Sequence, residues 1–497
     1  MELKKIIMSL GILGVLLTSC EKEEANFDNN NTSSTTEETQ SNSNNNEELE
    51  IEDFVYKGMN EIYLYKAEVP ELADDYFSND TEKFGYLDNF SSPEELFNAL
   101  TYSEDRFSFI TDDYVSLENR FQGISGSTGM KYGLGRIEGT NNVFGFLQYI
   151  LPGTSAEEAG LTRGTIFTEV NGQKLTTTNY KSLLDADSFT INTGSVEDGS
   201  IQMTEQTVTL TDDPYTSNPV YIAKTLDIEN KQIGYLMYNS FIGDFDDELN
   251  AAFGRFKAEG ISELILDLRY NGGGSVESAV DLASMITGQY EGEVFMKEQW
   301  NEKYQEHFET NDPERLINRF DSKIRTGEAI NSLNLNKVYI LTSSSTASAS
   351  ELVINGLAPY INVVQIGTNT TGKFQASVTM YDSPDFSKKN VNENHTYAIQ
   401  PLVFKSINSQ GRSDYTNGLA PNIQYTENLG NLGTLGDPSE PLLEVAINDI
   451  LGKAQLKQDE AENKMARKYE TIGQSGMYEP DFQRMYTNEI PPLLDRE

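Results

Sequence analysis

The chain has 497 residues, which corresponds to about three domains at roughly 150 residues each, and its 37% of hydrophobic residues exclude a wholly disordered protein. With 37 basic and 78 acidic residues the formal net charge is −41, which argues against binding to nucleic-acid phosphates. One cysteine, Cys20, and two histidines, His307 and His395, exclude an intramolecular disulfide and a cysteine-rich zinc site. We therefore expect no metal ion and no cofactor.

The first twenty residues predict an export signal. Two lysines precede an apolar run over 6–17, which is shorter than the about 20 residues that a membrane-spanning helix needs. The run leads to Leu-Thr-Ser-Cys at Cys20, which resembles the lipobox of bacterial lipoproteins; a plain secretory signal with a chance cysteine is the alternative. The resemblance implies a signal peptide over 1–19 and an exported protein. Its acylated Cys20 would anchor it to the lipid bilayer of a Gram-negative outer membrane, at the periplasmic face or the cell surface.

Residues 20–50 are expected to form a flexible tether. The stretch 28–48 contains only Asp, Asn, Thr, Ser, Glu and Gln, so it has nothing to bury against a core. Apolar residues then return at helical spacing, and the sequence over 91–97 has the serine, proline and acidic residues of a capped helix start. We therefore predict a small, mostly helical domain over 51–128.

A glycine-rich β region follows. Expected strands over 143–151 and 166–170 flank a turn, a short helix and a stop at glycine over 152–161. This run resembles a PDZ domain of the permuted kind found in bacterial proteases, placed over 129–212. The resemblance implies a loop before a strand whose backbone N–H groups bind the C-terminal carboxylate of a peptide; a structural glycine turn is the alternative. The loop residues are Tyr132, Gly133, Leu134 and Gly135.

From residue 213 onward, short apolar strands alternate with amphipathic helices, which is typical of an α/β fold whose sheet is covered by helices. Strands are expected over 233–238, 264–268, 338–342, 363–366 and 374–381, and helices over 246–259, 276–286 and 349–358. We interpret 213–450 as one core, the polar stretch at about 290–335 as an insertion or lid, and 451–497 as a C-terminal tail.

Two turns between a strand and a helix carry the candidate chemistry. Over Leu266 to Gly274 a buried strand ends in three glycines, whose amides are able to face a substrate. This loop lacks the lysine of a P-loop and the glycine spacing of a dinucleotide-binding loop. The segment Thr342 to Leu352 places serines at a helix start, where amides and the helix dipole favour negative charge. Taken alone, a structural turn and a helix cap explain these segments at least as well.

A nucleophilic serine needs a base. His307 lies in the polar stretch and His395 in a turn-like sequence, and no Gly-x-Ser-x-Gly elbow is present. Lys373, which opens the strand after Gly372, is the alternative base. A lone lysine at a strand start is normally a solvated surface residue, so its assignment depends on the serine segment.

Taken together, these segments resemble the carboxyl-terminal processing (tail-specific) peptidases. The chain has Asp-Leu-Arg-x-Asn-x-Gly-Gly at 267–274, Thr-Ala-Ser-Ala-Ser-Glu at 346–351 and Gly-Lys at 372–373. The resemblance covers about 129–450, and with the lipobox it looks like the PDZ-containing lipoprotein members of this family in Bacteroidetes. It implies a multidomain α/β protein: an N-terminal helical domain, a PDZ-like β-rich domain and a peptidase core similar to the crotonase fold.

The resemblance also implies the roles of individual residues. Ser348 corresponds to the nucleophile and Lys373, twenty-five positions further on, to the general base. The amides of Ala349 and of Gly273 or Gly274 correspond to the oxyanion donors. A lysine base must be neutral, so burial has to lower its pKa far below the reference value of about 10.4.

One departure from the family pattern concerns the residue that orients the lysine. Such peptidases often have a glutamine four positions after the lysine, and this chain has Ser377 there. Gln375 stands two positions after Lys373, on the same strand face by alternation. Either residue is a candidate for orienting the lysine amine.

The sequence therefore favours a serine endopeptidase that acts on exported polypeptides and captures their exposed C-termini with the PDZ-like module. A proteolytically inactive peptide-binding lipoprotein of the same fold is the alternative, supported by the departure at Ser377. A crotonase-type acyl enzyme is disfavoured by export and by the lack of a basic site for a nucleotide cofactor. The physiological substrate and the oligomeric state are not predicted by the sequence.

Overall fold

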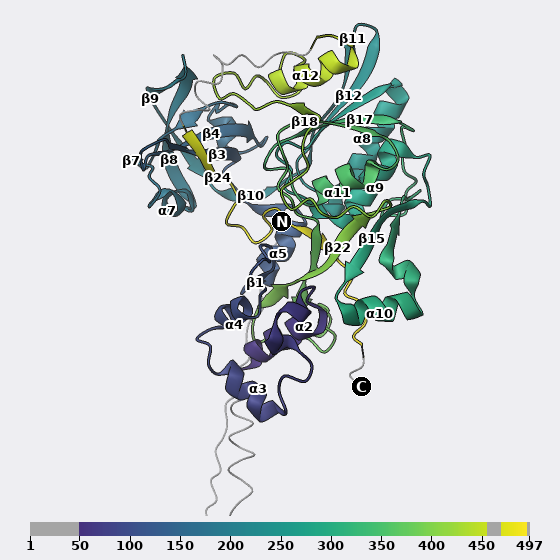
Figure 1. Ribbon diagram of the computed structural model, residues 1–497. Helices are drawn as coiled ribbons and strands as arrows, with labels where there is room; N and C mark the ends of the chain where they lie inside the picture. Colours follow the sequence, from purple (N-terminus) through teal and green to yellow (C-terminus); the bar gives the residue numbers. More distant parts are fainter. Residues whose placement is uncertain (1–48, 455–468, 495–497) are drawn as a thin grey trace, which may run out of the picture. The chain divides into compact units, whose positions relative to one another are not determined.

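The structure is a computed structural model that describes residues 49–454 and 469–494 (Figure 1). The expected signal peptide, Cys20 and nearly all of the expected tether lie outside the described residues. Within the described residues, no helix is both long enough and apolar enough to cross a membrane. The described residues from Leu49 on form one compact unit, and the domain boundaries expected from the sequence stay predictions.

A six-stranded sheet forms the centre of the α/β region. Its strands follow the order β11–β12–β13–β17–β18–β23, with β11 antiparallel to β12 and the remaining neighbours parallel. The nearly continuous apolar sequences of the inner strands fit a parallel sheet that is buried on both faces. The strands are β11 (Val220–Ile228), β12 (Lys231–Tyr238), β13 (Glu263–Asp267), β17 (Lys337–Thr342), β18 (Asn362–Gly367) and β23 (Ile423–Gln424).

Helices cover both faces of this sheet, so the α/β fold expected from the sequence is confirmed (Figure 1). The helices are α8 (Asp246–Glu259), α9 (Val276–Thr287), α11 (Ala349–Leu357) and α12 (Pro441–Ile450). Alternate residues of β13 separate the two layers: Leu264 and Leu266 join the hydrophobic cluster of α8, α9 and α11, and Ile265 joins that of α12. The helices therefore fix the C-terminal edge of the sheet, where the candidate loops lie.

A second six-stranded sheet, in the order β14–β25–β19–β22–β15–β16, lies next to the candidate loops. Its strands are β14 (Gly274–Ser275), β25 (Met485–Thr487), β19 (Gln375–Val378), β22 (Leu402–Asn408), β15 (Val294–Trp300) and β16 (Ile317–Arg319). The stretch 290–335 supplies β15, β16 and α10 (Glu302–Asn311), and its Trp300 and Tyr304 are buried in the main core. The stretch is therefore packed into the core by its apolar side chains, and its interpretation as an insertion stays a prediction.

The N-terminal helices share the hydrophobic cluster of the α/β core. Phe54, Met59 and Ile62 of α2 belong to the same buried cluster as Leu266. As expected for a capped start, Ser92 Oγ accepts a hydrogen bond (3.3 Å) from the third residue of its helix. The helices are α2 (Glu50–Ile62), α3 (Asp80–Leu87), α4 (Pro93–Ala99) and α5 (Tyr114–Phe121), and β1 (Phe109–Thr111) pairs with β21 (Ala398–Gln400), which pairs with β20 (Met380–Tyr381).

An eight-stranded sheet accounts for the β-rich region. Its order is β24–β3–β4–β5–β8–β6–β7, and β9 pairs with β8. Strand β24 (Tyr469–Gln474), from the segment interpreted as a tail, lies against β3 at the edge of this sheet (Figure 1). The other strands are β3 (Met130–Ile137), β4 (Val143–Ile150), β5 (Ile166–Phe167), β6 (Glu169–Val170), β7 (Gln173–Lys174), β8 (Ser188–Glu197) and β9 (Ser200–Thr211). Helices α6 (Ser155–Glu158) and α7 (Tyr180–Leu184) accompany them, and β2 (Ile124–Ser127) pairs separately with β10 (Asp213–Thr216).

Candidate active site

Ser348 lies at the turn from β17 into α11, immediately before the first residue of the helix. Its backbone has φ 65° and ψ −116°, a left-handed conformation that a residue with a side chain rarely adopts. The residue is fully buried, and its Oγ has no hydrogen-bond partner among the residues that the structure describes. A strained turn that presents an unpaired hydroxyl at a helix start is the geometry of a candidate nucleophile.

Lys373 immediately precedes β19 and is also fully buried. Within the described part of the chain its Nζ has no hydrogen-bond partner, and it lies 4.8 Å from the centroid of the Phe107 ring. Burial removes the ammonium group from water and lowers the pKa of Lys373 well below its ordinary value. The cation of Arg484 lowers this pKa further, while the carboxylates of Asp105 and Glu351 oppose the shift. The site therefore favours a neutral amine.

Glu351 connects the two loops that carry Ser348 and Lys373. Its Oε2 accepts hydrogen bonds from the backbone N–H groups of Ser348 and Lys373, each at 2.8 Å. Its Oε1 accepts from Thr370 Oγ1 (2.5 Å) and from Gly372 N (2.7 Å). Burial raises the pKa of Glu351, and these four donors oppose the shift. Glu351 ends the Thr-Ala-Ser-Ala-Ser-Glu motif, but no role was predicted for it; its position three residues after Ser348, the spacing of a capping box, was the available signal.

The glycine loop passes beside Ser348. Gly273 and Gly274 have φ values of 111° and 134°, which a residue with a side chain rarely adopts. A Cβ on Gly273 would lie 2.6 Å from Ser348 Cβ and 3.0 Å from Ala349 N. The N–H of Gly273 donates to Asn271 Oδ1 (2.8 Å), so this amide is already engaged. Among the expected oxyanion donors, Gly274 and Ala349 are therefore the better candidates.

Neither residue expected to orient the lysine amine contacts it by a hydrogen bond. Gln375 Nε2 donates to the hydroxyl of Tyr65 (3.0 Å). Ser377 Oγ donates to Gln400 Oε1 (2.7 Å) and lies 3.2 Å from the carbonyl oxygen of Met485. The structure places both on β19 directly after Lys373, but their side chains are committed to other partners.

The loop expected to bind a C-terminal carboxylate is instead part of a strand. Tyr132, Gly133, Leu134 and Gly135 lie within β3, between β4 on one side and β24 on the other. Tyr132 N donates to Ser475 Oγ (3.1 Å), so its amide faces the chain itself. A Cβ on either glycine would fall inside an aromatic ring of β4, at 2.2 Å from Phe146 or 2.6 Å from Phe144. The glycines therefore allow two aromatic rings to cross the strand, which corrects the expected open loop.

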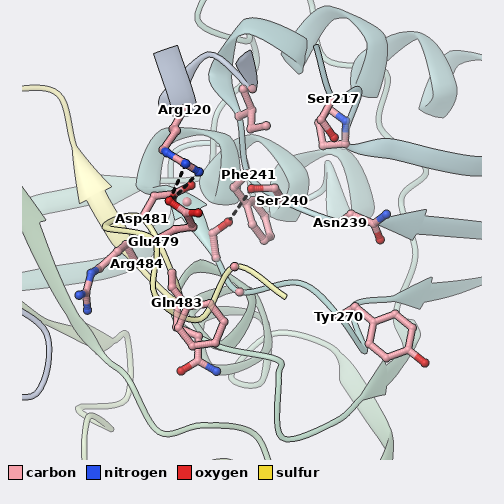
Figure 2. A pocket seen from close by; sticks show the side chains of 18 of the residues that line it. Arg120, Ser217, Asn239, Ser240, Phe241, Tyr270, Glu479, Asp481, Gln483 and Arg484 are labelled. Carbon is pink, nitrogen blue, oxygen red and sulfur yellow. Dashed lines mark hydrogen bonds and ion pairs between the residues drawn. The ribbon is translucent and has the colours of Figure 1, made fainter. Parts of the chain in front are cut away.

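A pocket of about 220 Å³ lies on the outer side of the glycine loop (Figure 2). It is lined by Gly272 to Gly274, by α5 and by residues between 474 and 486, and neither Ser348 nor Lys373 lines it. Arg120 points toward two acidic side chains across this pocket, with ion-pair distances of 2.5 Å to Glu479 and 3.9 Å to Asp481 (Figure 2). The C-terminal segment and the glycine loop thus line this pocket together.

A buried ionic network supports the strand that leads into the glycine loop. Arg269 is fully buried and pairs with Asp267 (2.8 Å), Glu440 (2.7 Å) and Glu427 (2.9 Å). The surrounding cations lower the pKa of Glu427 to about 2 although burial alone would raise it. Asp267 and Arg269 of the expected motif therefore hold the loop in place rather than taking part in chemistry.

Two descriptions of one family match this chain. "Peptidase family S41" matches residues 232–425, which include both candidate loops, and "Peptidase S41 N-terminal domain" matches residues 50–109. The chain is 23% identical over 290 residues to a carboxyl-terminal-processing protease of Picosynechococcus sp., which covers 53% of this chain and 63% of the relative. It is 24% identical over 224 residues to a "Probable CtpA-like serine protease" of Staphylococcus aureus, which covers 45% and 40% respectively. The chain thus spans less than two thirds of the length of these curated relatives.

A solved structure from Bacteroides fragilis, assigned to the S41 proteases, shares the fold. It is 26% identical with a TM-score of 0.63, and the match covers 80% of this chain and 97% of that one. The two family matches, together just over half of the chain, agree with the motifs at the serine, the lysine and the glycine loop. The chain therefore belongs to peptidase family S41, the carboxyl-terminal processing peptidases expected from its sequence.

Proposed function

We propose that this protein is a serine endopeptidase of the tail-specific type, which hydrolyses peptide bonds of exported polypeptides through an acyl-enzyme. The observation that carries the proposal is the environment of Lys373: the amine is fully buried and has no carboxylate bound to it within the described residues. A lysine in water is almost entirely protonated at neutral pH, because its reference pKa is about 10.4. Burial of this kind supplies the neutral amine that a general base requires.

The chain's own residues account for each step. Ser348 Oγ attacks the substrate carbonyl carbon while Lys373 Nζ takes the hydroxyl proton. The amides of Ala349 and Gly274 stabilise the negative charge on the carbonyl oxygen. Lys373 then returns the proton to the leaving amine, which leaves an acyl-enzyme ester on Ser348. A water molecule hydrolyses this ester with Lys373 again as the base.

Location and substrate capture are part of the same proposal. Cys20 would carry the lipid anchor, so that the peptidase domain works outside the cytoplasm on polypeptides with exposed C-termini. The β-rich region over 129–212 would bind such C-termini in the manner of a PDZ domain. Because β24 occupies the edge of β3, a peptide must take the place of that strand to pair there.

A second function, a peptide receptor without proteolytic activity, is favoured by one observation. Neither Gln375 nor Ser377 hydrogen-bonds to the amine of Lys373, so nothing in the described part of the chain orients it by such a bond. Hydrolysis of casein or of a peptide with a free C-terminus separates the two functions directly.

The test compares four variants by initial rates between roughly pH 6 and 10, a range that brackets a lowered lysine pKa. Ser348→Ala should abolish hydrolysis, and Lys373→Arg should be as inactive as Lys373→Ala, because guanidinium does not lose its proton in this range. Lys389→Arg, at an exposed lysine, is the matched control and should behave as the parent. The parent rate should rise with pH through one ionisation well below 10.4. A substantially active Lys373→Arg protein would exclude Lys373 as the base.

A further inference from the structure

The C-terminal segment over 469–487 forms two strands, one at the edge of β3 and one beside the turn that carries Ser348. Its first part, β24, pairs antiparallel with β3, with Thr471 opposite Gly135 and Gln474 opposite Gly133. Ser475 N donates to the carbonyl oxygen of Tyr132 (2.8 Å), which extends the pairing by one residue. The edge of the β-rich sheet next to the expected carboxylate-binding residues is thus filled by the chain itself.

The second part of the segment, β25, enters the peptidase site as a strand. It pairs in parallel with β14, which follows the glycine loop, and with β19, which follows Lys373. Met485 is fully buried between them. Arg484 O and Ser348 Cβ each lie 2.6 Å from the position of a Cβ on Gly273. A peptide backbone therefore runs past the nucleophile, between the two strands that carry the oxyanion loop and the base.

Two pockets lie beside the segment that contains β25. Residues 474–486 of the segment line the pocket of about 220 Å³ beside the glycine loop. Residues 486–492 line a second pocket of about 650 Å³, formed with α5, β20 and the side chains of Arg315 and Arg325. An extended chain thus lies in a path with free volume at both ends, as a longer peptide would require.

We propose that residues 469–487 are an intramolecular pseudosubstrate that closes the resting enzyme, and that an incoming polypeptide must displace them to reach Ser348. This inference rests on the proposed function and adds the regulation of its site. Adding a strand to an exposed sheet edge binds a peptide mainly through its backbone. The same slot therefore accepts the chain's own segment or an extended substrate of different sequence.

The residues that lie between β24 and β25 in the sequence make contacts that an incoming chain is able to replace. Glu479 forms its ion pair with Arg120 while 39% of its side chain is exposed. Tyr478, which is 53% exposed, contacts the hydroxyl of Tyr180 (2.5 Å) and lies under Lys181 Nζ, 4.0 Å from its ring centroid. Half-exposed pairs of this type contribute little each, so the stretch between β24 and β25 is held weakly, whereas Met485 and Tyr486 of β25 are buried.

The test measures access to residue 348 independently of catalysis. In a full-length Cys20→Ser, Ser348→Cys protein the new thiol is the sole cysteine, and its alkylation by iodoacetamide is followed by mass spectrometry. This protein is compared in three forms. The first keeps Arg120 and Glu479, the second carries Glu479→Arg, and the third, the charge swap, carries both Arg120→Glu and Glu479→Arg. Glu479→Arg replaces an attraction by a repulsion and should accelerate alkylation about fivefold. The swap restores the attraction and should return the rate toward that of the parent.

Equal alkylation rates in the three forms would overturn the inference, as would an acceleration that the swap leaves unchanged. Hydrolysis is measured in parallel with Ser348 intact. If both proposals hold, the rate of hydrolysis should rise in Glu479→Arg and fall back toward the parent rate in the charge swap. If the alkylation rate rises in Glu479→Arg and falls in the charge swap, but no form hydrolyses the substrate, the proposed function is refuted. The inference that the C-terminal segment covers residue 348 would then still hold.

Discussion

Replacement of Glu351 tests whether one buried carboxylate fixes the positions of Ser348 and Lys373 relative to each other. Its two oxygens accept four hydrogen bonds, of which three come from backbone N–H groups on the two loops. In Glu351→Gln the amide nitrogen is accommodated best beside Thr370, because that hydroxyl is able to accept instead of donate. The remaining oxygen then still serves Ser348 and Lys373, and only Gly372 N–H loses its acceptor.

The expected magnitudes follow from this count. One buried N–H without a partner costs about 1–3 kcal/mol, which is the predicted loss in the free energy of unfolding for Glu351→Gln. Glu351→Ala leaves three such groups and a hydroxyl unpaired, which should cost on the order of 5 kcal/mol and detach the two loops from each other. The Gln protein should therefore keep hydrolysis within about tenfold of the parent, a loss that corresponds to roughly 1.4 kcal/mol, and the Ala protein should be inactive.

The pH profile supplies a readout that a purely structural role would not change. The negative charge of Glu351 raises the pKa of Lys373, so its removal in Glu351→Gln lowers that pKa further. The rising limb of the rate against pH should therefore move to lower pH. Urea unfolding and initial rates are measured together, with Glu248→Gln at an exposed position as the control. A shift to higher pH, or an Ala protein with the stability and rate of the parent, would refute the reasoning.

Three further predictions concern the frame of the site. Gly274→Ala should abolish hydrolysis and destabilise the protein, because its Cβ would lie 2.1 Å from a backbone carbonyl oxygen; Gly272→Ala, with its nearest contact at 3.4 Å, should be tolerated. Burial raises the pKa of Asp281 to about 8, so the folded state binds a proton more tightly than the unfolded chain and stability should fall from about pH 4 to 8. Asp281→Asn should remove that part of the fall and be more stable than the parent at pH 8 in urea unfolding. Arg269→Met should cost about 3–5 kcal/mol in the same assay, because Asp267 stays buried without a cation and Glu440 keeps only Arg163, at 3.9 Å.

The sequence was sufficient where the signal is local. Apolar runs such as 264–268 predicted the parallel strands, since a strand buried on both faces needs no polar alternation. The sequence predicted Ser348 in a turn between a strand and a helix and Lys373 at the start of a strand, and the structure joins these two segments through Glu351. The pair Ser348 and Lys373 was assigned from the resemblance of these motifs to a peptidase family, and its roles stay a prediction; the structure places Ser348 in the turn after β17 and Lys373 between β18 and β19.

The sequence was insufficient where a strand depends on a distant partner. Strand β24 is short and mostly polar and β25 has three residues, so neither shows the periodicity that marks a strand. Both form because β3, β14 and β19 offer unpaired edges, which is information that the local sequence does not contain. The same reason explains the error at Tyr132 to Gly135, where glycines that admit aromatic rings resemble glycines that leave amides open.

The protonation state of Lys373 depends on parts of the chain far from the motif that identifies it. Phe107, which lies over its amine, comes from the N-terminal region, and the neighbouring Arg106 donates to the carbonyl oxygen of Gly372 (3.2 Å). Arg484, whose charge also disfavours the ammonium form, comes from the C-terminal segment. The α/β core alone would keep Ser348 and Lys373 but lose part of the environment that lowers the pKa of the lysine. Both ends of the described chain therefore contribute to the environment of Lys373, and the proposed displacement of the C-terminal segment would change access to Ser348 and the pKa of Lys373 together.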